Sequence, residues 1–245
     1  MGECRLGTSG WSYRDWRGLL YPKGTRQSDF LAVYAQHFST VELNATFYRV
    51  PTPQMVAGWR DKVPEGFRFC PKLSRAVSHR KDWQGAKQGI QRFAQRLAPL
   101  APRLGPVLVQ LPPSRQFDRD QAQVLLTALR EHCPDWRFAL EARHESWFDA
   151  PALALLREHG FAAVMADAGG RYPQTREVTA DFAYVRLHGP GGRYDRAYGG
   201  AALDEWAERI EGLRASVNEI WVFFNNTEGG HAIADLRALA GRLAR

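Results

Sequence analysis

Eight short apolar segments alternate with helix-like segments along the chain, and this alternation restricts the fold more than any other feature. Most pairs of segments are separated by an amphipathic stretch with capping residues, such as Thr52 followed by Pro53. The expected strands are Arg5–Ser9, Thr40–Ala45, Phe67–Lys72, Pro106–Leu111, Arg137–Ala142, Ala162–Asp167, Phe182–His188 and Glu219–Asn225. Strands and helices alternating over 245 residues predict an α/β fold, a single (β/α)8 TIM-type barrel, rather than a doubly wound sheet.

One connection breaks the pattern. The link after Asp167, AGGRYPQTREVTA, has no helical periodicity, so we expect the helix after strand six to be missing or degenerate. No linker, repeat or low-complexity segment interrupts the chain. Residues 1–245 are therefore predicted to form one barrel domain.

Composition restricts the class of protein. No apolar run approaches the length of a membrane span and the start MGECRLGTSGW lacks a signal pattern, so we expect a cytoplasmic protein with no membrane partner. Cys4, Cys70 and Cys133 are odd in number and far apart, which indicates reduced thiols. The net charge of +7 favours anionic partners, nucleic acid among them. The oligomeric state is not predicted.

Polar residues gather where the expected strands end. Val41 and Leu43 alternate with Glu42 and Asn44, and the apolar phase should face the outer helices, so the polar phase should point into the barrel. The inward set is Glu42, Asn44, Lys72, Gln110, Glu141, Arg143, Asp167, Arg186 and His188. All lie at carboxyl ends of strands, where barrel active sites are built.

The acidic members and the histidine are the predicted catalytic residues. Two carboxylates in a partly dry cavity have their pKa values pushed apart, so that one donates a proton and the other accepts it. The candidates for this acid–base work are Glu42, Glu141, Asp167 and His188. Two alternatives stay open: a structural ion network in which the glutamates only neutralise basic groups, and a zinc or manganese site made by the same four residues. No cofactor is predicted.

The basic members are predicted to hold an anion. Lys72, Arg143 and Arg186 would clamp a carboxylate or phosphate. The loops HGPGGRYDRAYGG and NNTEGGHA bring glycines close to helix starts, which is typical of barrel phosphate sites, although loop glycines often serve only turns. Loop aromatics could stack on a sugar or a base, or simply pack together. The predicted substrate-binding residues are Trp11, Asn44, Lys72, Gln110, Arg143, Arg186, Tyr194, Tyr198 and Asn225.

Six motifs carry a family resemblance. GTSGWSYRDWRGLLYP, VELNATFYRVP, VQLPPS, EARHESW, YVRLHG and FNNTEGGHA resemble the motifs of the YecE-like family, domain of unknown function 72, from Gly7 to Ala232. The resemblance implies a TIM-type barrel and supplies no activity. Similarity of such barrels to apurinic endonucleases and sugar isomerases suggests DNA or sugar-phosphate ligands by analogy of fold. The stretch CPKLSRAVSH keeps the lysine and final histidine of the family pattern and otherwise departs from it, so no role is assigned to His79.

These observations predict an enzyme of hydrolase or isomerase type that acts on a phosphorylated or otherwise anionic small molecule at the mouth of the barrel. The alternative is a nucleic-acid-binding protein, such as an endonuclease-like DNA-binding barrel, which would carry basic and aromatic side chains over one rim. An interaction scaffold would leave the charged mouth unexplained.

Overall fold

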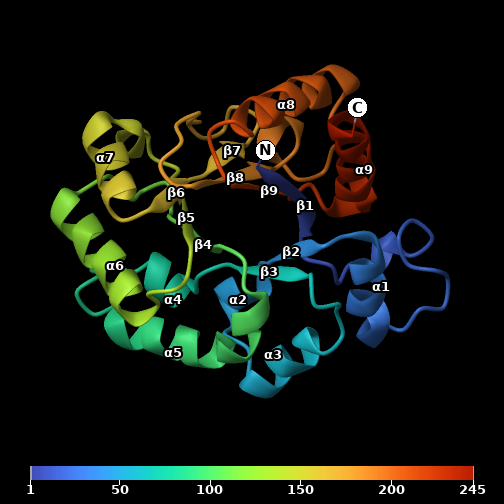
Figure 1. The fold of residues 1–245 in the computed structure, drawn as a ribbon, viewed down its shortest axis with the longest axis horizontal. Helices are drawn as coiled ribbons and strands as arrows, with labels where there is room; N and C mark the ends of the chain where they lie inside the picture. Colours follow the sequence, from blue (N-terminus) through green and yellow to red (C-terminus); the bar gives the residue numbers. More distant parts are fainter. Residues whose placement is uncertain (1, 245) are drawn as a thin grey trace.

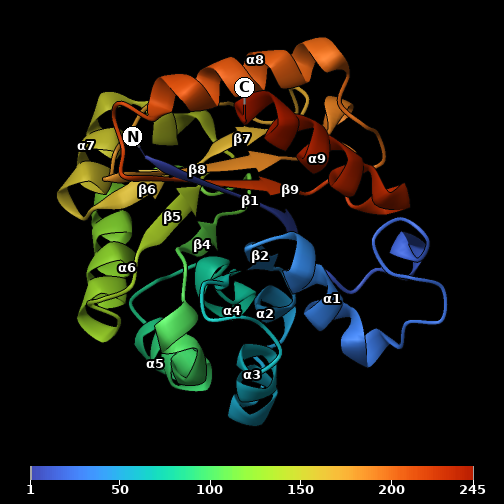
Figure 2. The ribbon, with the colours of Figure 1, turned by 45° about the vertical axis from the view of Figure 1, so that its right-hand side comes forward.

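Parallel strands surround the centre of the molecule and helices lie outside them (Figures 1 and 2). The computed structural model describes residues 2–244. The strands are β1 (Glu3–Ser9), β2 (Thr40–Leu43), β3 (Arg68–Pro71), β4 (Val107–Gln110), β5 (Phe138–Glu141), β6 (Phe161–Ala163), β7 (Met165–Asp167), β8 (Phe182–Leu187) and β9 (Glu219–Phe224). The α-helices are α1 (Phe30–His37), α2 (Ala45–Tyr48), α3 (Pro53–Arg60), α4 (Arg75–Ser78), α5 (Lys87–Leu97), α6 (Arg119–His132), α7 (Ala150–Glu158), α8 (Gly200–Leu213) and α9 (His231–Leu243).

The hydrogen-bonded ladder is divided into two parallel sheets. One has the order β3-β2-β1-β9-β8-β7 and the other the order β4-β5-β6. Only isolated bridges, Phe69 with Leu104 and Lys72 with Leu108, join β3 to the segment that contains β4. Pro71 and Pro106 lie at this seam and have no N–H to donate. The expectation of a closed eight-stranded barrel is therefore confirmed only in part: the strands are parallel and helix-covered, but the ladder does not close.

The second division falls inside the sixth expected strand. Residues 162–167 are observed within two short strands, β6 and β7, separated by Val164. β6 pairs with β5, and β7 pairs with β8, so each half follows a different neighbour. Residues 168–181, all described, contain no helix, as the sequence predicts for this connection.

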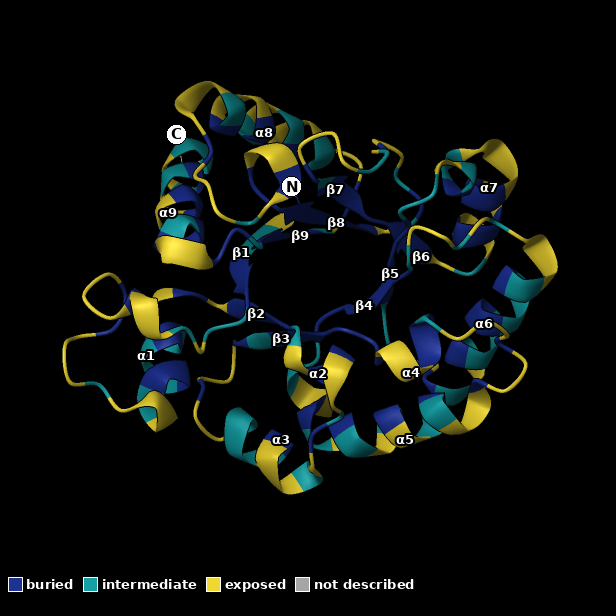
Figure 3. Ribbon diagram, turned by 180° about the vertical axis from the view of Figure 1, so that it is seen from behind, coloured by how far each residue is buried: buried dark blue, intermediate teal, exposed yellow. Residues whose placement is uncertain are grey.

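Two apolar layers hold the strands in place. Outward residues such as Val41, Val185 and Leu187 pack against the helices. Inward residues at the amino-terminal side of the ring, including Leu108, Phe182 and Trp221, form a second cluster inside it. Figure 3 shows the strands buried and the outer faces of the helices exposed. Helix starts agree with their sequence signals where caps are present: the Thr52 side chain accepts a hydrogen bond from the Met55 N–H at the start of α3.

Every helix within residues 2–244 is too short or too polar to span a lipid bilayer.

Candidate functional site

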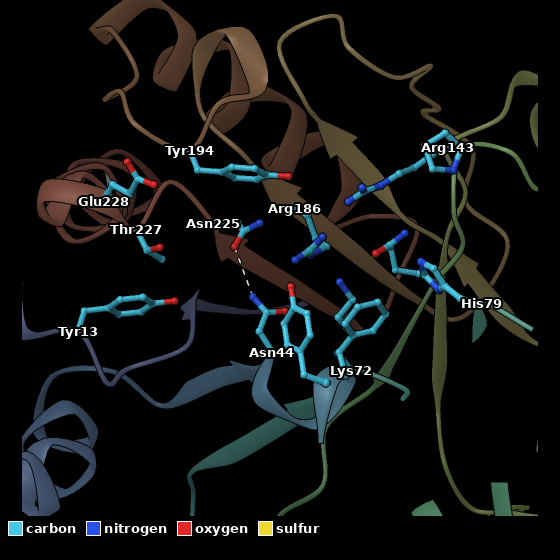
Figure 4. A pocket seen from close by; sticks show the side chains of 14 residues that line it. Tyr13, Asn44, Lys72, His79, Arg143, Arg186, Tyr194, Asn225, Thr227 and Glu228 are labelled. Atoms are coloured by element: carbon cyan, nitrogen blue, oxygen red, sulfur yellow. Dashed lines mark hydrogen bonds between the residues drawn. The ribbon is translucent and has the colours of Figure 1, made fainter. Parts of the chain in front are cut away.

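A cavity of about 540 Å³ opens at the carboxyl ends of the strands. Its size is in the range of small-molecule sites, roughly 300–1,000 Å³. The lining residues are Tyr13, Asn44, Phe47, Tyr48, Lys72, His79, Gln110, Pro113, Arg143, Arg186, Tyr194, Asn225, Thr227 and Glu228. Figure 4 shows Arg186 at the centre of this group, with Lys72, Arg143 and Asn225 around it.

Arg186 is held beneath the cavity by two carboxylates. Its Nε and Nη2 donate to Glu42 at 2.9 and 2.7 Å, and its Nη1 donates to Glu141. These residues come from β8, β2 and β5, and each is at most 1% exposed. A planar guanidinium with a fixed fork of donors suits this double pairing. The pairing explains how three charged groups can be buried together.

Glu42 has no free oxygen for chemistry. Besides Arg186, the Ser9 hydroxyl donates to its Oε1 at 2.7 Å and the Tyr184 hydroxyl donates to its Oε2 at 2.8 Å. Glu42 does not line the cavity. The structure therefore places it as a support for Arg186, which corresponds to the alternative of a structural ion network.

Glu141 links the two arginines. Its Oε1 accepts from Arg143 Nε at 2.9 Å, and its Oε2 accepts from Arg186. Burial alone would raise the pKa of Glu141, but the positive charges of Arg186 and then Arg143 outweigh it and hold the pKa well below its usual value. Burial likewise opposes the charge of Arg186, whereas Glu141 and Glu42 raise its pKa. Both shifts favour the charged forms of Glu141 and Arg186.

Lys72 sits beside the network without joining it. Its side chain is 8% exposed, and its Nζ lies 4.2 Å from the centroid of the Phe47 ring. No carboxylate of residues 2–244 lies within salt-bridge distance of Lys72. Burial, followed by the charge of Arg186, lowers the pKa of Lys72 to about 8. Lys72 is therefore the cation of the cavity floor that has no anionic partner among the described residues.

His188 lies under the cavity as a neutral imidazole. Burial and then Arg186 lower its pKa to about 3. Its Nδ1 lies 2.9 Å from the Asn225 amide nitrogen, and the oxygen of that amide is 3.5 Å from the Asn44 amide nitrogen. If the Asn225 nitrogen donates to Nδ1, the ring carries its proton on Nε2, which lies 3.8 Å from Glu141. His188 thereby orients the amides that line the cavity.

The rim is aromatic, with one carboxylate. Tyr194 has the left-handed backbone φ of 68° and its ring meets His188 edge-on at 5.4 Å. Tyr13 and Tyr48 come from the loop after β1 and from α2, and Tyr48 is 73% exposed. Glu228, in the loop after β9, lies across the cavity from Arg143 (Figure 4). The negative charge of Glu228 would repel an anion from the glycine loop after β9. An anion would therefore bind more favourably at Lys72 and Arg143 than at that loop.

The structure corrects the predicted position of Asp167. Asp167 is paired in register with Leu187, which faces the helices, whereas Ala166 is paired with Arg186, which faces the interior. The Asp167 carboxylate accepts hydrogen bonds from the Tyr198 hydroxyl at 3.1 Å and the Gly169 N–H at 2.9 Å. Both faces of the sixth expected strand carry apolar residues, so the alternation pattern could not show which face points into the barrel. The four-ligand metal site considered from the sequence is not assembled.

Two predicted binding residues also lie outside the cavity lining. The Tyr198 hydroxyl accepts from the Gly189 N–H at 3.0 Å and supports the loop after β8. Trp11 packs edge-on against Trp59 at 5.6 Å, which supports the alternative of loop packing. The remaining predicted binding residues all line the cavity: Asn44, Lys72, Gln110, Arg143, Arg186, Tyr194 and Asn225.

Sequence reasoning missed part of the lining. Phe47 lies in the one-turn helix α2 after β2, and His79 follows directly after the one-turn helix α4, which comes after β3. His79 had one signal, as the final histidine of CPKLSRAVSH, and Phe47 had none because a single aromatic after a strand is usually packing. Burial, with Lys72 next in importance, lowers the pKa of His79 to about 4. Thr227 and Glu228 were not predicted because loop residues do not alternate between two faces as strand residues do.

Comparisons with known proteins agree with the motif resemblance. The family model described as "Protein of unknown function DUF72" matches residues 5–245. The chain is 28% identical to UPF0759 protein YunF of Bacillus subtilis, over 93% of this chain and 90% of that protein. It is also 32% identical to UPF0759 protein YecE of Escherichia coli K12 over 58% of this chain, a match that spans 49% of YecE.

Solved structures extend the comparison to the fold. A DUF72 family protein from Thermotoga maritima superposes with a TM-score of 0.88 and 32% identity, covering 99% of this chain and 100% of that chain. A DUF72 family protein from Enterococcus faecalis gives a TM-score of 0.87 and 25% identity, covering 99% and 96%. A psychrophilic glycoside hydrolase family 10 xylanase gives a TM-score of 0.51 at 11% identity over 91% of this chain and 86% of that chain, a likeness of fold alone.

Proposed function

The chain belongs to the DUF72 family, and because that family's description names no activity, we propose a function from the site itself: an enzyme that binds a phosphorylated or otherwise anionic small molecule at the carboxyl ends of the strands. Its chemistry would be acid–base work of the hydrolase or isomerase type.

One observation carries the proposal. Three cations, Lys72, Arg143 and Arg186, stand at the cavity floor against two carboxylates, Glu42 and Glu141, both of which the arginines already occupy. A buried charge without a partner is costly, so proteins retain one chiefly where a ligand supplies the partner. An anionic group at Lys72 and Arg143 would complete the charge balance.

The amides and aromatic rings of the lining fit a polar, compact substrate. Asn44, Gln110 and Asn225 offer donors and acceptors around the cations, and Tyr13, Tyr48 and Tyr194 offer ring faces. Acid–base work would fall to Lys72 and His79, two titratable groups among those that line the cavity. Glu141 and His188 lie one layer below and would position Arg143 and Asn225.

The test is thermal unfolding at low ionic strength with inorganic sulfate, glucose 6-phosphate and glucose. We expect the anions to raise the Tm and glucose to leave it unchanged, because a ligand of the native state alone stabilises by mass action, about 2.7 kcal/mol at a hundred times its Kd. The gain should shrink in Lys72→Met and Arg143→Met, and stay in Lys62→Met, whose exposed amine binds the Ser28 carbonyl. Equal protection by glucose, or none by either anion, would contradict the proposal; compounds that protect then enter assays of turnover.

A second candidate, nucleic-acid binding, is favoured by Tyr48. An aromatic side chain left 73% exposed beside a cationic cavity is suited to stacking on a base, and the net charge of +7 would attract the backbone. Fluorescence anisotropy with labelled single- and double-stranded DNA and RNA, from low to physiological salt, tests it. Micromolar binding at physiological salt that is lost in Tyr48→Ala and in Lys72→Met/Arg143→Met would favour this candidate. Binding that vanishes with modest salt, alike in all variants, would eliminate it.

A further inference from the structure

Lys72 differs from the two arginines of the cavity in what its nitrogen contacts. Arg143 and Arg186 each donate to a carboxylate, whereas no hydrogen bond or ion pair to Lys72 Nζ is found within residues 2–244. The amine nevertheless lines the cavity from a side chain that is only 8% exposed. A shielded primary amine that no polar protein group engages is available to react with what enters the cavity.

The surroundings of Lys72 are those that activate an amine. Lysines become nucleophiles when they are desolvated in an apolar setting or placed beside another cation. Lys72 has both, because it is only 8% exposed and the guanidinium of Arg186 lies at the same cavity floor. The lowered pKa of Lys72, about 8, agrees with this setting. A substantial fraction of the amine can therefore be neutral near physiological pH.

His79 supplies a proton carrier in the same place. Its ring packs edge-on against Phe47 at 5.0 Å, so lysine and imidazole contact the same aromatic ring. Its Nδ1 lies 3.0 Å from the Ser78 hydroxyl, which leaves Nε2 for the cavity. With a pKa lowered to about 4, the imidazole is neutral near pH 7 and gives up readily any proton that it takes up.

We propose that Lys72 is a covalent nucleophile that forms an imine with the carbonyl carbon of an anionic substrate, such as a keto acid or a phosphorylated sugar in its open-chain form. The inference rests on the proposed function, because the anionic group of such a substrate would lie against Arg143. It adds a substrate class: carbonyl compounds that carry a negative charge.

The steps balance without any further reactant. The Lys72 ammonium releases a proton to solvent, and the neutral amine attacks the carbonyl carbon while one nitrogen proton passes to the carbonyl oxygen, forming a carbinolamine. The C–O bond then breaks as His79 takes up a solvent proton and passes it to the hydroxyl, which leaves as water. The sum is ammonium plus carbonyl giving protonated imine plus one water, so the net positive charge is conserved.

The experiment uses pyridoxal 5′-phosphate, an anionic aldehyde, and pyridoxal, the same aldehyde without the phosphate. Each is incubated with the full chain, trapped with borohydride, and located by peptide mass mapping. We expect the phosphorylated aldehyde to label Lys72 at least tenfold faster than the exposed Lys62, sulfate to slow this labelling, and pyridoxal to label Lys72 more slowly. Lys72→Arg should lose the label, whereas Lys62→Arg should behave as wild type in both assays.

The outcomes separate the two proposals. Protection by sulfate together with Lys72 labelling no faster than Lys62 labelling would overturn the imine and leave the anion site standing. Lack of protection by both sulfate and glucose 6-phosphate would overturn the proposed function and this inference with it. The labelling rates are measured on the wild-type chain, so the result does not depend on how well a variant folds.

Discussion

The two ends of the space inside the strands are filled by different chemistry, although the same strands supply both. Along β8 the inward side chains run from Phe182 and Tyr184 to Arg186 and then His188. Tyr184 is the point of change, because its ring packs against Phe223 while its hydroxyl donates to Glu42. The apolar end holds the fold, and the ionic end carries groups that packing does not require.

The ionic end is itself divided. The charges of Glu42, Glu141 and Arg186 satisfy one another, so their large desolvation cost is offset within the protein. The charge of Lys72 is not offset by any ion pair within residues 2–244, and its lowered pKa reflects that cost. Burial of charge by itself therefore gives no reason to expect a ligand, whereas a buried charge left unpaired does. Three substitutions and one pH titration test this division.

The largest effect is expected for Arg186→Met. It would leave Glu42 and Glu141 buried without their shared partner, and removing one member of a buried pair typically costs about 3–5 kcal/mol. Urea unfolding measures the loss. The control is Arg157→Met, which breaks the exposed pair with Glu177 and should cost at most about 1 kcal/mol. Equal costs for the two variants would mean that the central network does not stabilise the fold.

Leu108→Ala tests the apolar end. Leu108 is fully buried in the interior cluster, so its truncation should reduce the free energy of unfolding by about 3 kcal/mol. Binding of sulfate, measured by calorimetry below the unfolding range, should stay within a factor of two of wild type. A large change in sulfate affinity would show that the two ends are not independent.

Lys72→Met should stabilise the protein. The Lys72 amine has a pKa of about 8 in the folded protein and 10.5 in the unfolded chain, so its charge opposes folding at pH 7. Removing the amine should therefore increase the free energy of unfolding by about 2 kcal/mol. Between pH 8 and 10.5 the unfolded state binds more protons, so wild-type stability rises with pH and the advantage of the variant shrinks. Urea unfolding at pH 7 and 9.5 measures both, with Lys62→Met as the control. A variant less stable than wild type at pH 7 would assign Lys72 to structure.

The smallest effect is the pH dependence of sulfate binding. Sulfate keeps its charge across pH 7–9, whereas the Lys72 ammonium, protonated below a pKa of about 8, is lost as the pH rises. Affinity should therefore fall by up to about tenfold from pH 7 to 9 in the wild type, since a tenfold change is about 1.4 kcal/mol. In Lys72→Arg the affinity should stay nearly constant, because a guanidinium does not titrate in this range. A parallel decline in both proteins would point to another group.

Most of the fold, and many of the polar residues at the site, can be predicted from the sequence. All eight expected strands are observed, with the sixth divided, and most of the polar residues at their carboxyl ends meet at or just beneath one cavity, because the carboxyl ends of parallel strands share one edge. Phase arguments place Glu42, Glu141 and Arg186 inward because their apolar neighbours must face helices. The predicted phase of Asp167 was wrong because Ala163, Val164 and Met165 show no contrast between the two faces.

Polar and apolar residues alternate with a period of two along a strand. The sequence is therefore enough to show which polar residues at the strand ends share a face. Which of these residues pair depends on the folded chain. Arg186 meets Glu42 across 144 positions and Glu141 across 45, and these contacts bury both glutamates in ion pairs beneath the cavity. Pairing depends on distances between strands that are far apart in the sequence. These distances also decide which buried charge is left without a partner. That charge is on Lys72.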